Sequence, residues 1–265
     1  GELGVRARTE RMDCILTLGG DGTIHEVVNG LLAEGVHPDL PVLGTVPGGS
    51  ANVFARALGF PQDAVESTGL LLRAMREGTT RTVGLGMFDE RYFTFTAGLG
   101  IDAEIMTRME QARAQGKSAS PTRYLATTLR QFFTATDRKQ PSLILHAPGE
   151  EPVDGVFLAI VQNTSPWTYL AAHPINPSPK ASFDTGLDLW ATRSLRVPAA
   201  LRLGARMVLS RDKGSPKASV SWHDRPEFRI TARRPTPMQV DGEVIGDVTD
   251  VVFRSVPRAL RVYVP

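Results

Sequence analysis

The chain is poor in cysteine: Cys14 is the only one among 265 residues. A single cysteine excludes an internal disulfide, and its place in an apolar run typical of a buried strand favours a reducing environment. Residues 1–13 are charged and lack the apolar stretch of a signal peptide. No segment reaches the roughly 18 uninterrupted apolar residues that a membrane-spanning helix needs. The sequence therefore predicts a cytoplasmic protein without a membrane span.

The net charge of the chain is also small. The 30 lysines and arginines nearly balance the 28 aspartates and glutamates, which leaves a formal charge of +2. That excess is too small to indicate nucleic acid as a partner. Hydrophobic residues make up 42% of the chain and charged residues 22%, so a globular fold is expected rather than disorder. The histidines show no zinc-ligand spacing, and the serine-hydrolase elbow G-x-S-x-G is absent.

Two short apolar runs in the first third of the chain each end in a glycine-rich turn. Residues 14–18 precede Gly-Gly-Asp-Gly-Thr at positions 19–23, and residues 42–46 precede Pro-Gly-Gly-Ser at positions 47–50. Short apolar runs bounded by glycine are typical of buried parallel strands. A helix-like segment follows each turn, and this alternation predicts a parallel sheet with crossover helices.

Three helices are expected in this part of the chain. Thr23 is expected to open the first, because Glu26 three residues later completes a capping box. A second spans about residues 52–58. Asp63 is expected to cap a third, which ends at Gly78.

The pattern changes near residue 80 and becomes mainly strand-like. Residues 82–88 and 92–96 alternate like paired strands around a short turn, and helices are expected at 103–114, 123–134 and 198–209. Further strands are expected at 142–146, 156–162, 187–192, 227–231, 238–240, 251–254 and 260–264. Asp241-Gly242 is a strong hairpin signal. The fold class is therefore α/β in the first third and mainly antiparallel β in the rest.

The first glycine turn has the composition of a phosphate-binding loop. Glycines let the backbone approach a phosphate without a side-chain clash, and the N–H groups at a helix start favour an anion. Asp21 places a carboxylate beside this site, where a magnesium ion carried by ATP would offset its repulsion from phosphate. The bland interpretation is a structural turn in which Thr23 only caps the helix.

The second glycine turn repeats this arrangement on the neighbouring strand. Adjacent strand ends of a parallel sheet share one crevice, so the two turns are expected to form one phosphate cradle. Ser50 can donate its hydroxyl to a phosphate. Asn52 has two open interpretations, a ligand contact or the N-cap of the following helix.

Five segments in one order resemble the catalytic domain of the diacylglycerol kinase family, especially its soluble bacterial members. They are residues 19–23 (GGDGT), 47–56 (PGGSANVFAR), 96–102 (TAGLGID), 182–188 (SFDTGLD) and 239–243 (QVDGE). GGDGT alone is also found in NAD kinases and phosphofructokinases, whereas the five together are specific. They cover the chain from about Cys14 to its C-terminus.

The resemblance implies two domains. The first would be a Rossmann-like nucleotide-binding α/β domain over residues 1–84, N-terminally truncated because only residues 1–13 precede Cys14. The second would be a β-sandwich over residues 85–254, with the lipid entering the cleft between them. A C-terminal strand over residues 255–265 would return to the first domain.

The resemblance also implies a site. ATP and Mg²⁺ would be the cofactors, with Glu243 as the proton acceptor and Asp21 as the second catalytic residue. A structural magnesium would bind Asp184 and the carbonyls of Ala181 and Gly186. The residues expected to bind nucleotide are Gly19, Gly20, Asp21, Gly22, Thr23, His25, Gly48, Gly49, Ser50 and Asn52.

Glu243 also has a physical interpretation of its own, because phosphoryl transfer needs a base for the acceptor hydroxyl and a hairpin can carry one into a cleft. Without the other motifs, Asp241 and Glu243 would be ordinary turn residues. One departure affects the site: Val53 stands where many members of the family have Asp. Metal and substrate contacts near that turn are therefore in doubt.

The expected partners are ATP and a lipid at the inner face of the membrane, with no nucleic acid; a homodimer is left open. Basic residues could hold the chain on anionic lipid, although solvated helix faces explain them as well. They are Arg108, Arg113, Lys117, Arg123, Arg130, Arg138, Lys139, Arg202, Arg206, Arg211, Lys213 and Lys217. Phe132, Phe133, Trp167 and Tyr169 could line a lipid entrance, but aromatic residues more often lie in a core. Two other functions stay open: an NAD kinase, or a non-catalytic nucleotide- or lipid-binding relative.

Overall fold

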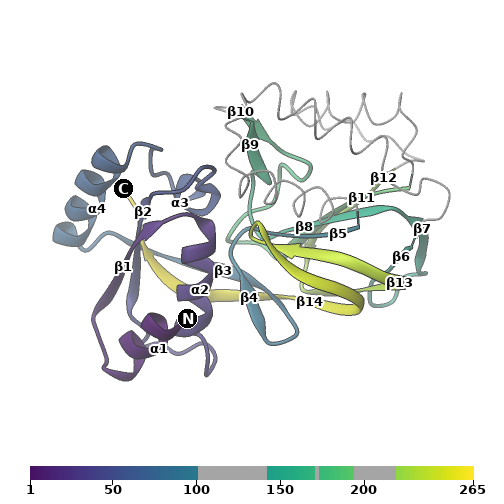
Figure 1. Ribbon diagram of the computed structural model, residues 1–265, viewed down its shortest axis with the longest axis horizontal. Helices are drawn as coiled ribbons and strands as arrows, with labels where there is room; N and C mark the ends of the chain where they lie inside the picture. Colours follow the sequence, from purple (N-terminus) through teal and green to yellow (C-terminus); the bar gives the residue numbers. More distant parts are fainter. Residues whose placement is uncertain (101–141, 171–172, 194–218) are drawn as a thin grey trace.

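The computed structural model describes residues 1–100, 142–170, 173–193 and 219–265. These residues form two lobes, one with helices beside two parallel strands and the other built of antiparallel strands (Figure 1). The helices expected at 103–114, 123–134 and 198–209 lie outside the described residues, as do all the basic residues proposed for lipid contact.

The first lobe has the expected strand–turn–helix order. Strand β1 (Cys14–Gly19) pairs in parallel with β2 (Val42–Pro47), and Gly19 lies opposite Pro47. The helices are α1 (Glu2–Thr9), α2 (Asp21–Leu31), α3 (Val53–Ala57) and α4 (Ala64–Glu77). Their apolar faces pack into one core with β2. Because β1 and β2 run parallel, both glycine bends fall at the same edge of the sheet.

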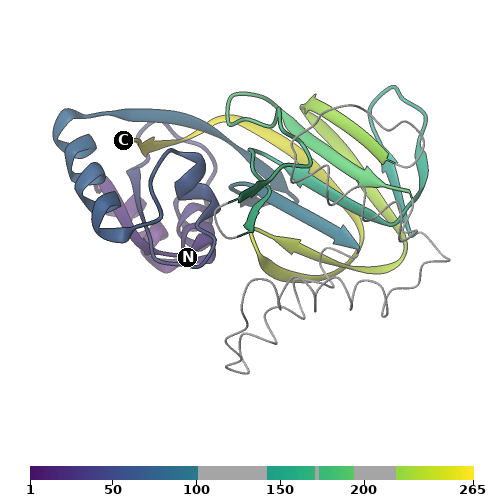
Figure 2. The same cartoon turned by 90° about the horizontal axis from the view of Figure 1, so that it is seen from above.

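Two long strands join the lobes. β3 (Thr80–Phe88) and β14 (Glu243–Tyr263) pair along most of their length, and Val262 of β14 also pairs with Leu43 of β2. Val83 and Leu260 lie in the core of the first lobe, whereas Phe88 and Phe253 lie in that of the second. Figure 2 shows both strands running from one lobe into the other. The predicted boundaries at residues 84 and 254 thus fall inside continuous strands.

The second lobe is antiparallel β, as expected. Its strands share one buried core, in which Trp222 and Phe253 both contact Phe228. They follow the order β14-β13-β5-β8-β11-β12, with β4 beside β3, β6 beside β13 and β7 beside β6. Their bounds are β4 (Arg91–Phe93), β5 (Thr96–Gly100), β6 (Leu143–His146), β7 (Val153–Val156), β8 (Leu158–Gln162), β11 (Leu187–Thr192), β12 (Ser219–Arg225) and β13 (Glu227–Val240). A separate hairpin consists of β9 (Thr168–Leu170) and β10 (His173–Ile175).

The strands near the C-terminus are longer than the sequence predicts. The segments expected at 227–231 and 238–240 form one strand, β13, and those at 251–254 and 260–264 belong to β14. The register shifts between Thr231 and Thr236 and between Val256 and Leu260. The strands remain paired on both sides of these residues, which interrupt the alternation of apolar and polar side chains. Such bulges hide a continuous strand from a period-two pattern.

Strand β1 is not buried, contrary to the prediction for residues 14–18. It ends the strand order and pairs only with β2 among the described residues, so one of its faces is open. Leu16 is 49% exposed and Leu18 is 74% exposed.

The start of helix α2 also differs from the prediction. The helix begins at Asp21 with Gly20 as its N-cap, and no side chain caps it. Glu26 lies 3.1 Å from the N-terminal ammonium of Gly1, so the expected capping box with Thr23 does not form. Helix α4 is capped as predicted, because Asp63 accepts a hydrogen bond from the N–H of Glu66 and Gly78 ends the helix with φ of 70°. None of the described helices is long and apolar enough to cross a membrane.

Candidate active site

The two glycine-rich bends lie against each other at the carboxyl ends of β1 and β2. The N–H of Gly48 donates to the carbonyl of Gly19 at 2.8 Å. A Cβ on Gly49 would lie only 2.6 Å from the Cα of Gly20, so a larger residue there would push the two backbones apart. The predicted meeting of the two bends, called the crevice below, is confirmed, and phosphate binding there stays a prediction.

The surface of this crevice is accessible. Thr23, Gly48, Gly49 and Ser50 are exposed, and residues 19–22 are partly so. Helix α2 begins in the crevice at Asp21, so its first unpaired N–H groups lie beside the second bend. Such a helix start favours an anion. The nucleotide contacts expected of these residues stay predictions.

Asn52 occupies the N-cap position of α3, as one of the two interpretations has it, while the ligand contact stays a prediction. Its side chain is buried, accepts a hydrogen bond from the N–H of Gly49 at 2.8 Å and donates one to the carbonyl of Gly49 at 2.9 Å. It makes no side-chain cap for α3, and its own backbone is left-handed with φ of 50°. Asn52 therefore braces the second bend from behind.

Asp21 links the two bends. Its carboxylate accepts hydrogen bonds from the N–H groups of Val53 and Phe54 at 3.0 and 3.1 Å, so it caps α3 from the neighbouring bend. Burial raises the pKa of the Asp21 carboxyl to about 6, against the lowering effect of these bonds and with a further rise from the charge of Asp241. Each oxygen keeps lone-pair capacity after one such bond, so the carboxylate fits a magnesium ion brought by a nucleotide.

Glu243 reaches this region from the second lobe. Asp241 and Gly242 form the predicted two-residue turn, with φ of 49° and 88°, and Val240 pairs with Glu243 across it. A Cβ on Gly22 would lie 2.2 Å from Oε1 of Glu243, so this carboxylate rests on the first turn of α2. The second lobe therefore brings an acid to the helix that begins at the nucleotide bend.

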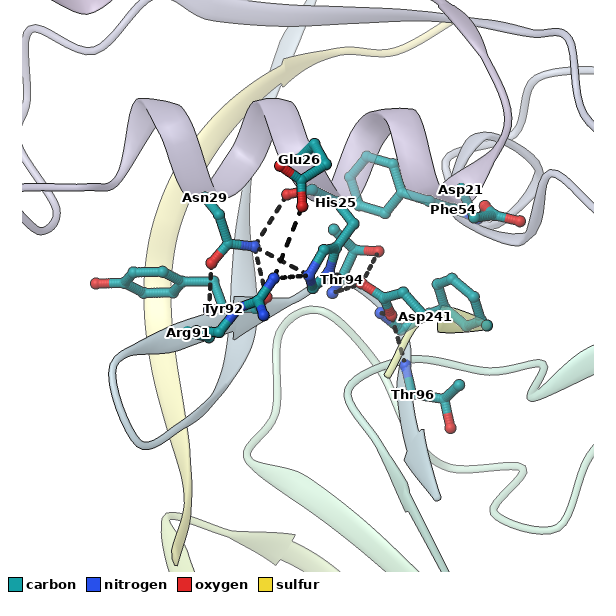
Figure 3. A network of polar contacts seen from close by, with 12 residues as sticks. Asp21, His25, Glu26, Asn29, Phe54, Arg91, Tyr92, Thr94, Thr96 and Asp241 are labelled. Carbon is teal, nitrogen blue, oxygen red and sulfur yellow. Dashed lines mark hydrogen bonds and ion pairs between the residues drawn. The ribbon is translucent and has the colours of Figure 1, made fainter. Parts of the chain in front are cut away.

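Asp241 is the centre of a buried polar network (Figure 3). Its Oδ2 accepts hydrogen bonds from the N–H and the hydroxyl of Thr94 at 2.7 and 2.9 Å. Its Oδ1 accepts from the N–H groups of Phe95 and Thr96 at 3.0 and 3.1 Å. The ring of His25 approaches Oδ2 at 3.2 Å. Through these hydrogen bonds, Asp241 links the β13–β14 turn to the β4–β5 connection and to α2.

His25 turns toward the second lobe. Its side chain is fully buried, and Nδ1 faces Asp241 while Nε2 lies 3.3 Å from Nη2 of Arg91 and 3.4 Å from Nδ2 of Asn29. The structure therefore surrounds the ring with protein groups, and a nucleotide contact through it stays a prediction. Asn29, one helical turn further, donates to the carbonyl of Tyr92 and accepts from its N–H, both at 2.9 Å.

One further group of potential metal ligands lies here. Ligand atoms of His25, Glu26 and Glu243 are within 4.8 Å of one another, and they are the only such His, Cys, Asp and Glu cluster in the described part of the chain. Arg91 already provides positive charge at 3.7 Å from Glu26. An imidazole is also a poor ligand for magnesium, so this group does not fit that ion.

The residues expected to hold a structural magnesium do not fit one either. Asp184 is 66% exposed, and its carboxylate accepts a hydrogen bond from Arg81 at 2.6 Å. The carbonyl of Ala181 accepts from the N–H of Ser165 at 3.1 Å, and the N–H of Gly186 donates to Asp224. A guanidinium thus balances the one carboxylate of the set. Arg81 lies on β3, far from Asp184 in sequence, so the motif alone does not indicate this pairing, and the structural magnesium stays a prediction.

Arg56 makes a contact between the lobes that the sequence does not indicate. Its guanidinium carbon lies 3.2 Å from the ring centroid of Tyr169, on the β9–β10 hairpin of the second lobe. Its Nη1 is buried and has no hydrogen-bond partner. Tyr169 packs against the core of the first lobe, and Trp167 packs against Trp190 and its neighbours. The suggestion that these aromatic residues line a lipid entrance stays a prediction.

Sequence reasoning also missed the network around Asp241. His25 and Asn29 stand four residues apart on an amphipathic helix, which signals a shared polar face. Nothing in the sequence indicates that this face meets a turn more than two hundred residues later, because that contact depends on how the two lobes dock.

Comparison with known proteins identifies relatives of the first lobe. Residues 2–88 match the family model of the diacylglycerol kinase catalytic domain. Diacylglycerol kinases of Staphylococcus carnosus and Staphylococcus aureus are 38% identical over 100 and 95 residues, which is 38% and 36% of this chain. The matched segments span 30% and 28% of those relatives.

Solved structures resemble the whole fold. A putative diacylglycerol kinase from Bacillus anthracis has a TM-score of 0.73 at 19% identity, covering 100% of this chain and 83% of that one. An NAD kinase from Archaeoglobus fulgidus in complex with ATP has a TM-score of 0.51 at 12% identity, covering 96% and 78%. At such identities the likeness concerns the fold, a two-lobed architecture that these proteins share.

Proposed function

We propose that this chain transfers the γ-phosphate of ATP to a lipid hydroxyl, because residues 2–88 match the model of the diacylglycerol kinase catalytic domain. Diacylglycerol is the first candidate acceptor, and other glycerolipids or sphingoid bases follow it. The proposal includes contact with a membrane surface from the aqueous side, where such an acceptor is found.

One observation supports this proposal more than any other. Glu243, from the second lobe, rests on Gly22 in the first turn of the helix that begins between the two glycine bends. Phosphoryl transfer is mostly positioning and charge stabilisation, and it needs an acceptor hydroxyl close to both a base and the γ-phosphate. An acid above an anion-binding helix start meets that requirement.

The proposed roles follow from this placement. The backbone N–H groups of residues 19–23 and 48–50 bind the phosphates, and Ser50 and Thr23 add hydroxyl donors at the exposed rim. Asp21 holds the magnesium ion that accompanies ATP. Glu243 accepts the proton of the lipid hydroxyl. Val53 offers no carboxylate here and instead donates its N–H to Asp21.

The first test is direct. The protein is incubated with labelled ATP and vesicles containing, in turn, diacylglycerol, monoacylglycerol, a sphingoid base or ceramide, and the lipids are extracted. Label in one lipid supports the proposal and names the acceptor. Parallel assays with NAD test the alternative that the shared fold raises, and NADP formation without lipid labelling would replace the lipid-kinase assignment.

The second test concerns Glu243. Replacing a general base costs about two to four orders of magnitude in rate, so Glu243→Gln is expected to lower kcat by that factor. Nucleotide affinity, measured with a fluorescent ATP analogue, should stay near the wild-type value because Glu243 does not cradle the phosphates. Unchanged turnover would remove Glu243 from the mechanism. A protein that binds nucleotide and labels no acceptor would instead be a non-catalytic relative.

A further inference from the structure

The buried contact between His25 and Asp241 joins the nucleotide helix to the turn that carries Glu243. Both side chains are 0% exposed, and they come from opposite lobes, α2 and the β13–β14 turn. We propose that His25 is a positioning residue, which sets the place of Glu243 by holding Asp241 and does not itself bind nucleotide. This proposal rests on the proposed kinase function for its kinetic consequence, but its structural part stands alone.

The hydrogen-bond partners of His25 define its tautomer. Nε2 faces Nη2 of Arg91, which only donates, so Nε2 accepts. Asn29 does not alter this assignment, because its Nδ2 already donates both hydrogens to backbone carbonyls and its Oδ1 accepts from Tyr92. The ring proton therefore sits on Nδ1 and is donated to the carboxylate of Asp241.

The remaining contacts of Asp241 hold its side chain in one position. Its carboxylate also accepts from Thr94, Phe95 and Thr96, so the turn is fixed to the β4–β5 connection. The N–H of Asp241 donates to the carbonyl of Thr96 at 2.9 Å, and the N–H of Gly242 donates to Oε1 of Gln239 at 3.0 Å. A side chain so constrained transmits the position of its partner to the backbone that carries Glu243, two residues later.

The geometry of α2 makes this position relevant to the chemistry. Gly22, His25 and Asn29 lie on one face of α2, three and four residues apart, and each touches the second lobe. Helix α2 also begins at the nucleotide bend. Because one rigid helix contacts both the phosphate site and the Asp241 turn, the separation between the base and the γ-phosphate is set through α2.

His25→Leu tests this proposal, since leucine fills a similar volume and cannot donate to Asp241. A misplaced catalytic group costs up to about hundredfold in rate, so kcat is expected to fall about tenfold to hundredfold. The Kd of a fluorescent ATP analogue should stay within about threefold of wild type, because uniform binding is unchanged. His25→Asn keeps a donor near the place of Nδ1 and should restore most of kcat.

Asn29→Leu is the matched control. It removes another polar contact between α2 and the second lobe but keeps the hydrogen bond between His25 and Asp241. If His25→Leu and Asn29→Leu lower kcat equally, the effect is a general loosening of the lobes and the proposal fails. It also fails if His25→Leu weakens nucleotide binding at constant kcat, which is the result expected of a nucleotide ligand.

Amide hydrogen exchange gives a reading that needs no activity. In His25→Leu, peptides covering residues 238–246 should exchange faster by about tenfold or more than in wild type, with little change in α4. Unchanged protection of this turn would overturn the proposal even if the rate falls. A wild-type protein that labels no lipid would refute the proposed function, while the exchange result would still decide whether His25 holds the turn.

Discussion

Each lobe contributes an Asp-Gly dipeptide, which is Asp21-Gly22 at the first bend of one lobe and Asp241-Gly242 at the β13–β14 turn of the other. Each aspartate accepts hydrogen bonds from the backbone of another element, which is α3 for Asp21 and the β4–β5 connection for Asp241. They differ in how fully they are occupied. Asp241 is fully buried and also accepts from Thr94 and His25, whereas Asp21 is partly exposed where the two glycine bends meet.

This difference distinguishes a structural aspartate from one that can still bind a ligand, although the two dipeptides are the same. A carboxylate with about four acceptor positions, most of them filled by fixed donors, has little capacity left for a ligand. Asp241 is in that position, and its fixed hydrogen bonds hold an inter-lobe contact in place. Asp21 keeps free acceptor capacity, and burial raises the pKa of its carboxyl to about 6. A raised pKa in a cleft is characteristic of functional sites.

The strongest way to break this comparison is Asp241→Ala. The change strands the N–H groups of Thr94, Phe95 and Thr96 and the proton of His25 in the protein interior. A buried donor left without a partner costs about 1–3 kcal/mol, so the loss of several at once should lower the free energy of unfolding by about 3 kcal/mol or more in urea melts. Asp247→Ala, an exposed acid on β14, is the control and should stay within about 0.5 kcal/mol. A loss below about 1 kcal/mol for Asp241→Ala would show that the network is not structural.

The pH dependence of Asp21 sharpens the comparison from the other side. Its carboxyl pKa is raised from 3.8 to about 6, so the folded protein holds a proton between these pH values that the unfolded chain has released. Stability from this group is therefore present below about pH 4 and is lost as pH rises through 6, by about 3 kcal/mol. Asp21→Asn lacks this loss. The stability of wild type relative to Asp21→Asn should fall by that amount between pH 4 and pH 7 without nucleotide, and a rise would contradict the assignment.

Gly22→Ala tests whether Glu243 is in fact held against Gly22 of the first bend. The new methyl group would meet Oε1 of Glu243 at 2.2 Å, so the acid or the turn must shift. A displacement of about 1 Å at a catalytic group can cost about hundredfold in rate, and that loss of kcat is expected with the fold intact. Gly69→Ala in α4, which meets open space, is the matched control and should raise stability by about 0.5–1 kcal/mol without changing kcat. Equal activity in both variants would place Glu243 away from α2.

Local patterns in the sequence predicted most of the first lobe and the elements of the second. The apolar runs before the glycine bends, the Asp63 cap and the Asp241-Gly242 turn depend on neighbours within a few residues, and the structure contains all of them. The cradle of two bends could also be predicted, because parallel strands place their carboxyl ends together.

The remainder depends on contacts between distant parts of the chain. Asn52 and Thr23 are residue types that commonly cap helices, but the carboxylate that caps α3 belongs to Asp21 on the other bend. His25 was expected at the nucleotide, and its ring contacts a turn of the second lobe. The exposure of β1 depends on its place in the strand order, which no pattern within residues 14–18 encodes.

A third aspartate completes the comparison with the smallest expected effect. Asp184 is 66% exposed and pairs with Arg81, which is 38% exposed, so neither burial nor fixed donors hold it. Exposed ion pairs contribute about 0–1 kcal/mol, and Arg81→Ala should therefore lower the free energy of unfolding by no more than that. Because the guanidinium already balances the carboxylate, added Mg²⁺ should leave the Tm of the nucleotide-free protein unchanged. If Mg²⁺ raises the Tm of wild type but not of Asp184→Asn, a cation belongs at this loop. Asp184 would then share the ligand-binding capacity that separates Asp21 from Asp241.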